Sequence, residues 1–495
     1  AALVTAGTLV VVSDATVTVT GTATVAEINA IAAKTTGVVT ATSSDGDMTT
    51  LAGLATASTD VITVTVSDAD STALAATALS TLGGKTAGVV TVTNAVAITG
   101  TAAEVTAALA TTDTLVVVSD ATVTVTDADA TVISAAALSA IGGSTTGVVT
   151  VTNAIAISGT AAEVTAALVT TSSLVVVSDA TVTISGTATT AEINAIAAKT
   201  TGVVTATSSD GDMTTLAGLT TASTDAITVT VTDATVSASD LISVNAATTV
   251  AVNAAAVTRV NGSVDNAKTL ITAVGASEIA GLNAAQFRLS DTGSNTTDDI
   301  LAITSFTSGR VTSFAETYVG TVAAFGSTSS AASIFGLINS NDLITNSSFT
   351  VQFTSAVSAT ATSLGDIVTS ASTLNFSVSI NASAIALVTG TTADIVSLVS
   401  NSAVSFASDV NFTVSDADSA ALAATALSTI GGSTTGTVTV TNAVAITGTT
   451  AELTAALVTA GSLVVVSDAT VTVSDADSAA VTAAALSAIG AKTTG

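Results

Sequence analysis

The stretch LVVVSDATVTVTDADATVISAAALSAIGGSTTG, residues 115–147, contains the pattern on which the whole chain is built. It opens with a short apolar run, and residues 122–126 then alternate Thr with Val. Alternation at a period of two is typical of a strand with one buried face. Residues 130–141 become rich in Ala and Leu at helical spacing, and Gly142 and Gly143 stand where a helix would end. The stretch therefore predicts strand, turn, strand, short helix and glycine stop.

Long, nearly identical copies show that this pattern belongs to a repeat array. Residues 3–68 recur as residues 168–233, and residues 67–126 recur as residues 415–474. A single unit of this kind cannot bury its own apolar face, so neighbouring copies must stack. Strand patterns begin near residues 9, 38, 61, 89, 115, 148, 174, 203 and 226. We predict a mainly β fold with short helices, a parallel β-solenoid whose coils of about 25–30 residues each hold two strands and a helix.

The composition and charge exclude several classes of protein. With 2% aromatic residues and no Pro, Cys, His or Trp, thin layers of small side chains are expected in place of a conventional compact core. The net charge of −28 argues against a nucleic-acid partner, because phosphate binding needs clustered Lys and Arg and the 8 bases are scattered along the chain. No apolar run reaches the roughly 20 residues of a membrane span. Without His or Cys the usual general base and thiolate are missing, so no enzyme is expected.

The regular repeats are interrupted in the middle of the chain. All ten Phe and all three Arg lie within residues 246–413. We therefore predict regular solenoid repeats over residues 1–245, divergent coils containing Phe and Arg over residues 246–413, and regular repeats again over residues 414–495. The chain starts at Ala1 without Met and stops at Gly495, where earlier copies continue into another strand, so we expect a piece of a longer protein.

Acidic residues mark the starts of several predicted helices. Thr-x-x-Glu capping boxes occur at Thr24–Glu27, Thr101–Glu104, Thr160–Glu163 and Thr449–Glu452. In such a box the Thr hydroxyl accepts a hydrogen bond from a first-turn amide, and the Glu reaches back to the N-cap. Other copies carry Asp-Ala-Asp instead, beginning at Asp68, Asp127, Asp416 and Asp475. We expect these aspartates to replace the box at the helix that follows.

Asp or Asn also recurs at the first turn between strands. The positions are Asp14, Asp68, Asn94, Asp120, Asn153, Asp179, Asp233, Asn442 and Asp468. Stacked carboxylates about 4.8 Å apart would repel each other by roughly 0.9 kcal/mol in a water-like dielectric, and interleaved Asn relieves this repulsion. A column of these residues is interpreted either as Asx turns with side-chain ladders or as a row of cation sites.

The two copies of SSDGDMTT contain the closest pairs of carboxylates. Asp45 and Asp47 flank one glycine, and Asp210 and Asp212 flank the other. A hard cation such as Ca²⁺ takes six to eight oxygen ligands, so these four aspartates are the candidate metal ligands and Ca²⁺ the candidate cofactor. Neither copy continues into a full calcium loop with a distal Glu, and an ordinary tight turn is the other interpretation.

Thr and Val alternate in several predicted strands, as at residues 122–126. Val is expected to face inward and Thr outward, so stacked coils would present rows of hydroxyl groups. Ordinary β propensity accounts for this pattern. A flat array of Thr also resembles the surface of ice-binding solenoids, which is the remote functional alternative.

The segments TGVVTVTNAIAISGTAAEVTAAL, residues 146–168, and LVVVSDATVTVTDADA, residues 115–130, resemble repeats of very large bacterial cell-surface proteins, the β-strand-repeat adhesins and surface-layer proteins. The resemblance implies secretion to the cell exterior, a structural or adhesive role, and often calcium. We expect self-association into a filament or surface-layer lattice, because unpaired strand edges template the addition of further copies. The alternative is the stalk or binding region of an adhesin, whose Phe-containing middle contacts a glycan or another cell-surface partner.

Overall fold

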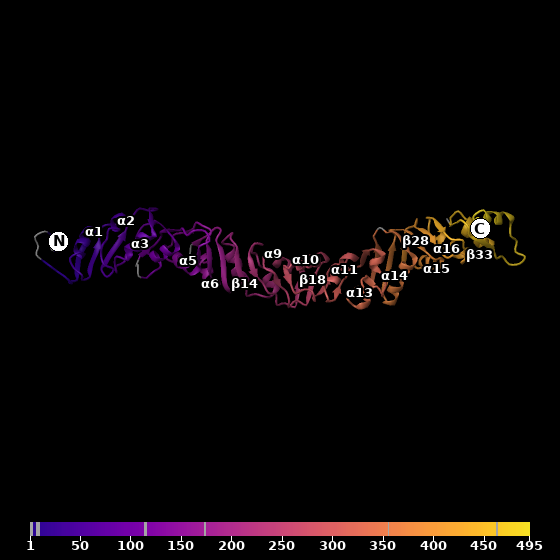
Figure 1. Cartoon of the computed structure of the whole chain (residues 1–495), viewed down its shortest axis with the longest axis horizontal. Coiled ribbons are helices and arrows are strands. Elements are labelled where there is room, and N and C mark those ends of the chain that lie inside the picture. Colours follow the sequence, from indigo (N-terminus) through magenta and orange to yellow (C-terminus); the bar gives the residue numbers. More distant parts are fainter. Residues whose placement is uncertain (1–2, 6–9, 113–115, 173–174, 355, 462–463) are drawn as a thin grey trace. The chain divides into compact units, whose positions relative to one another are not determined.

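The computed structural model describes residues 3–5, 10–112, 116–172, 175–354, 356–461 and 464–495. Contacts divide the chain into unit 1, Ala1–Asp233 with Ser243–Asn253, and unit 2, Ala234–Ile242 with Ala254–Gly495. Within each unit the helices follow one another in sequence order (Figure 1). The predicted boundaries at residues 245 and 413 stay predictions. Strand starts predicted near residues 9, 115 and 174 lie outside the described residues.

Unit 1 contains three sheets of five parallel strands. In spatial order the first holds β1 (Val17–Ala23), β2 (Val39–Ser43), β3 (Val61–Val66), β5 (Val90–Val92) and β7 (Val116–Val118). The second holds β12 (Val175–Val176), β10 (Val149–Val151), β8 (Thr122–Val125), β6 (Ala97–Gly100) and β4 (Ala73–Ala75). The third holds β15 (Ala226–Thr228), β14 (Val204–Ser208), β13 (Thr181–Ala188), β11 (Ala156–Thr160) and β9 (Val132–Ser134). Its helices are α1 (Val25–Ala32), α2 (Met48–Leu51), α3 (Ala76–Gly83), α4 (Ala102–Leu109), α5 (Ala135–Gly142), α6 (Ala161–Leu168), α7 (Thr190–Ala197) and α8 (Met213–Leu216).

Unit 2 is built in the same way. One sheet holds β16 (Thr235–Ser237), β18 (Arg259–Gly262), β20 (Gln286–Leu289), β22 (Val311–Thr312) and β24 (Leu343–Ile344), and the next holds β21 (Ser294–Thr296), β23 (Thr317–Gly320), β25 (Ser348–Phe353), β27 (Ser377–Ala382) and β29 (Val404–Phe406). A third sheet holds β26 (Ala356–Thr360), β28 (Ile385–Gly390), β30 (Asn411–Val414), β32 (Val438–Val440) and β34 (Val464–Val466). A fourth holds β31 (Ala421–Ala423), β33 (Ala445–Gly448) and β35 (Thr470–Val473). Its helices are α10 (Val264–Gly275), α11 (Thr297–Phe306), α12 (Val322–Phe325), α13 (Ile334–Ser340), α14 (Ala361–Thr373), α15 (Thr392–Val399), α16 (Ala424–Gly432), α17 (Thr450–Leu453), the π-helical η1 (Thr454–Val458) and α18 (Ala483–Gly490). The remaining elements are α9 (Ala238–Ala246), which contains residues of both units, β17 (Val252–Asn253) and β19 (Ile279–Ala280).

The register of the strands shows how the repeats stack. Ala97 pairs with Thr122 of the next strand in the sheet. The separation of paired residues along the chain varies: it is shorter for Thr40 with Val61 and longer for Thr317 with Thr350. We call the segment between two such partners a layer. The predicted order of strand, strand and helix is found, for example, in β5, β6 and α4. Helices and strands contribute nearly equal shares, 30% and 28% of the residues, so the fold is a parallel β/α repeat in which helix is as abundant as strand.

The stretch that opened the sequence analysis contains one strand more than predicted. Residues 132–134 form β9, which pairs with β11, and α5 begins only at Ala135. The prediction of a helix from Ala130 was wrong, because Ala130 has a φ of 60° in the left-handed region and cannot start a right-handed helix there. Gly143 is the C-cap of α5, as the glycine stop predicted. Leu115 lies outside the described residues.

The core lies between the inward face of the strands and one face of each helix. Val123 and Val125 of β8 are buried while Thr122 is exposed, which confirms the predicted alternation. In α5, Leu138 and Ile141 are fully buried on one helical face. Among the described residues, no helix combines the length and hydrophobicity that crossing a membrane requires.

Candidate functional site

The first pair of candidate calcium ligands lies at two different helix N-termini. Asp45 Oδ2 accepts a hydrogen bond from the amide of Val25, the first residue of α1, at 2.7 Å. Asp47 is the N-cap of α2 and its Oδ1 accepts from the amide of Thr50 at 2.9 Å. Hydrogen bonds from the hydroxyl and amide of Thr50 lower the pKa of Asp47. Both carboxylates therefore already take part in helix capping.

The second pair repeats this arrangement. Asp210 accepts from the amide of Thr190 at 2.7 Å, and Asp212 accepts from the amide of Thr215 at 2.9 Å. Throughout the described ranges, no three His, Cys, Asp or Glu side chains gather into a group that could hold a metal ion. A cation at either turn would take its other ligands from hydroxyl, carbonyl or water oxygens. Calcium binding by these four aspartates stays a prediction.

The contact made by Asp45 is the first of a series that links neighbouring layers. In each case an aspartate that follows a strand accepts a hydrogen bond from the first amide of the helix one layer earlier. A negative carboxylate at this position satisfies an otherwise unpaired amide and complements the positive end of the helix dipole. The further pairs are Asp68 with Met48, Asp127 with Ala102, Asp233 with Met213, Asp291 with Val264, Asp416 with Thr392 and Asp475 with Thr450.

The Asp-Ala-Asp motif therefore acts differently from the prediction, which assigned it to the helix that follows. That helix, α3, has Ala75 as its N-cap and no side-chain cap. Asp68 instead bonds the preceding layer, and Asp70 Oδ1 accepts from the amide of Ala95 in the following layer at 3.1 Å. One motif thus joins three successive layers. Local spacing could not reveal this, because both partners belong to other layers and are distant along the chain.

All four predicted capping boxes are confirmed. In the first, Thr24 N donates to Glu27 Oε2 at 2.9 Å and Glu27 N donates to Thr24 Oγ1 at 3.3 Å. Hydrogen bonds from the amide and hydroxyl of Thr24 lower the pKa of Glu27. A fifth box, Thr189–Glu192, was missed although it has the same spacing.

The Thr-Thr-Gly at the end of most copies is a second link between layers that was not predicted. Thr145 Oγ1 donates to the carbonyl of Ala121 in the previous layer at 2.6 Å and accepts from Gly147 N at 3.0 Å. Thr146 Oγ1 donates to Ser119 O at 2.8 Å. A Cβ on Gly147 would lie 2.2 Å from the Ala121 carbonyl oxygen, so only glycine fits. The signal was the recurrence of the tripeptide itself.

The predicted Asp/Asn column divides into separate short columns. Val66, Val92 and Val118 share one register, which places Asp68, Asn94 and Asp120 in one column. Asn94 Nδ2 donates to the backbone carbonyl of Asp68 at 2.7 Å, a contact from side chain to backbone between layers. Asn153 and Asn442 donate in the same way to Asp127 and Asp416. These contacts give the three Asn side chains a structural role, and both the ladder and the row of cation sites stay predictions.

The predicted rows of Thr are present over a few strands at a time. Thr99, Thr124 and Thr150 occupy one register, and the row then continues into Val176. An ice-binding surface stays a prediction.

Most of the Phe residues lie in the core of unit 2. Phe349 is 3% exposed, and its ring centroid lies 5.2 Å from that of Tyr318 and 5.8 Å from that of Phe376. Every Phe of the chain lies in the described residues and is buried or half-buried, so the aromatic residues form no surface patch. Burial raises the pKa of Tyr318 to about 12, against a weaker lowering by Ser313. Among the described residues, no hydrogen bond of normal geometry satisfies the phenol of Tyr318.

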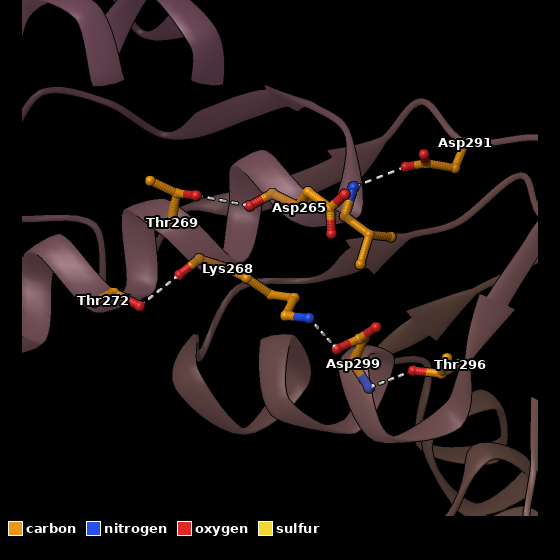
Figure 2. A network of polar contacts seen from close by, with 8 residues as sticks. Asp265, Lys268, Thr269, Thr272, Asp291, Thr296 and Asp299 are labelled. Atoms are coloured by element: carbon orange, nitrogen blue, oxygen red, sulfur yellow. Dashed lines mark hydrogen bonds and ion pairs between the residues drawn. The ribbon is translucent and has the colours of Figure 1, made fainter.

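A polar network joins α10 to its neighbours in unit 2 (Figure 2). Asp291 accepts from the first amide of α10 at 2.7 Å, which is the same contact between layers as in the regular repeats. Lys268 Nζ lies 2.6 Å from Asp299 Oδ1 on α11. Asp299 N in turn donates to the N-cap hydroxyl of Thr296 at 3.1 Å. The network links α10 to α11.

Two grooves run along the helices of unit 2. One, of about 540 Å³, is lined by apolar side chains that include Leu301 and Leu337. The other, of about 530 Å³, is lined by several hydroxyl-bearing residues, including Ser327 and Ser363, by the carboxylate of Asp366, and by small apolar side chains. Both volumes lie in the range of small-ligand sites.

Most acidic groups of the repeats take part in the structural contacts described above. Comparison with known proteins adds no function, since no protein-family model, curated protein or solved structure matches the chain.

Proposed function

We propose that the chain is a structural protein of the cell exterior, a filament or surface-layer component wound as a parallel β-solenoid of strand-strand-helix coils. Parallel partners one layer apart support this winding. The Asp and Thr-Thr-Gly contacts support a structural role, because they occupy polar side chains in holding one layer to the next.

One observation carries the proposal that copies associate end to end. The octapeptide AAALSAIG forms both α5 and α18, yet Leu138 in α5 is 0% exposed and Leu486 in α18 is 44% exposed. Likewise, β8 and β35 share the sequence TVTV, and Val125 is 0% exposed whereas Val473 is 37% exposed. The coil at residues 464–490 thus presents apolar surface that a further coil covers elsewhere. Where this coil is the last of the protein, a second copy supplies the coil that covers it.

Electron microscopy of the purified chain tests this proposal. Filaments or sheets are expected for the wild type, and Val473→Lys with Leu486→Lys should abolish end-to-end growth by burying charge in the contact. Val132→Lys is the matched control, because Val132 is 69% exposed in β9, which pairs with β11 and lies away from the last coil. Dispersed monomers at all concentrations, with and without Ca²⁺, would contradict self-association.

The hydroxyl-lined groove favours one alternative, the binding region of an adhesin. Ser and Thr hydroxyls with one carboxylate match the hydrogen-bonding groups of a glycan. Binding to a glycan array that Ser363→Trp abolishes, without filament formation by the wild type, would favour this alternative.

Calcium is a separate proposal, supported by the acidic turns at Asp45, Asp47, Asp210 and Asp212. Millimolar Ca²⁺ should raise the melting temperature relative to chelator, because an ion that binds only the folded state stabilises it. Asp47→Asn with Asp212→Asn should remove the increase. An identical melting temperature in Ca²⁺ and in chelator would contradict calcium binding.

A further inference from the structure

The three Arg residues of the chain, far apart in sequence, lie on one sheet of unit 2. Arg259 pairs with Gln286, and Phe287 pairs with Val311, so Arg310 stands opposite Gln286 on its other side. Arg288 pairs with Asn261 in the neighbouring position of β18. The bases described as scattered in the sequence analysis are therefore brought together by the strand register.

All three guanidinium groups are on the outward face of this sheet. Val260, Phe287 and Val311, which alternate with the arginines, are at most 1% exposed. Successive side chains of a strand point to opposite faces, so Arg259, Arg288 and Arg310 are exposed together. Strands about 4.8 Å apart place the Cα atoms of Arg259 and Arg310 about 10 Å from each other, with Arg288 diagonally between them. We call these three residues the Arg face.

Two of the arginines are held in position over the sheet. The guanidinium carbon of Arg288 lies 4.6 Å from the ring centroid of Phe314, and Arg310 Nε donates to the carbonyl of Asn341 at 3.1 Å. The nearby Asp342 carboxylate accepts from the Ser340 hydroxyl at 2.7 Å. Among the described residues, the ion pair between Lys268 and Asp299 involves none of the three arginines. The Arg face thus has fixed donors without carboxylate partners.

The charge of the chain indicates what this face binds. Acidic residues outnumber basic ones by 36 to 8, so a local cluster of three Arg is complementary to the surface of another copy. Exposed carboxylates are available at the Ser-Asp turns, where Asp120, Asp179 and Asp468 each accept from the hydroxyl of the preceding Ser. A guanidinium fork suits such carboxylates because it donates two parallel hydrogen bonds.

We propose that the Arg face binds the Ser-Asp turns of a second copy and so provides a side-to-side contact. The inference rests on the proposed self-association and adds a second contact to the end-to-end one.

Sedimentation velocity of the full chain tests the Arg face. Arg259→Gln with Arg288→Gln and Arg310→Gln should raise the dissociation constant for side-to-side association about tenfold, as expected for three exposed ion pairs. Lys34→Gln with Lys199→Gln and Lys492→Gln changes the net charge equally at exposed sites elsewhere and should leave association unchanged. Raising NaCl from about 0.1 to about 0.5 M should weaken the wild type and not the Arg variant. Circular dichroism checks that each variant is folded.

A charge-swap mixture identifies the partner. Replacing the three arginines by Glu should stop self-association, as should replacing Asp120, Asp179 and Asp468 by Arg, whereas a mixture of the two variants should associate. Wild-type assembly that the Arg→Gln variant retains in full would overturn the Arg face and leave the proposed function standing. A monomeric wild type that binds soluble polygalacturonate through the same arginines would overturn both proposals in favour of an acidic polysaccharide.

Discussion

The regular repeats and the divergent middle at residues 246–413 share their links between layers and differ in the core and on the outer face. Asp291 caps α10 in the middle as Asp127 caps α4 in the repeats. Thr307 donates to the Ala285 carbonyl at 2.6 Å as Thr145 donates to Ala121. Aromatic side chains, however, replace Val and Leu inside, and arginines appear outside. The links between layers therefore define the fold, while the side chains of the core and of the outer surface can differ from region to region.

The largest expected effect tests the difference in the core. Phe349→Ala should lower the local free energy of opening by about 3–5 kcal/mol, because it removes a buried ring with several ring neighbours. Val125→Ala in the repeats should cost about 2 kcal/mol, because fewer buried carbons are lost. Hydrogen exchange read layer by layer measures both. Equal losses would mean that the aromatic core adds nothing to the middle.

A smaller effect tests the shared link. Thr145→Val and Thr307→Val keep the side-chain shape and remove the hydroxyl, so each should cost about 1–3 kcal/mol by leaving buried backbone groups unpaired. Thr124→Val, at a half-buried outward position, is the control and should be nearly neutral. The same hydrogen-exchange experiment measures the loss of stability. A large loss in only one of the two regions would contradict a shared link.

A change in the opposite direction is expected at Tyr318. Tyr318→Phe removes the buried, unsatisfied hydroxyl while keeping the ring, so the middle should become more stable by up to about 1 kcal/mol. The urea midpoint of unfolding measures the gain. A loss of stability would show that the phenol has a partner, most simply Ser313.

The smallest expected effect per group is the loss of stability at low pH. Hydrogen bonds from the hydroxyl and amide of Thr450 lower the pKa of Asp475. The contacts of Thr24 and Thr50 likewise lower the pKa values of Glu27 and Asp47. These carboxylates therefore stabilise the folded state at pH values above the ordinary pKa, 4.5 for Glu and 3.8 for Asp. This stabilisation is lost as pH falls through the lowered values. Hydrogen exchange at pH 7, 5 and 3 should show the loss at α1, and Glu27→Gln should make this loss smaller, with the remaining Asp45 contact still present. Loss of protection at α1 already between pH 7 and 5 would contradict the assignment.

Local patterns in the sequence predicted the parts of the fold that depend on neighbouring residues. The alternation at residues 122–126, the Thr101–Glu104 box and the Gly143 stop each act within one turn or strand, and all are found. Asp70 and Thr145 act on residues of the adjacent layer, so their roles depended on a register that spacing alone does not set. The Arg face was hidden for the same reason.

The Asp-Ala-Asp motif has a consequence for how such a chain changes length. Because each motif contacts only the layers before and after it, inserting or removing a whole block of layers leaves every remaining contact intact. The near-identical blocks at residues 3–68 and 168–233 carry the same caps, on α1 and on α7. Recombination between such blocks would yield longer or shorter proteins that fold equally well, so length can evolve independently of stability.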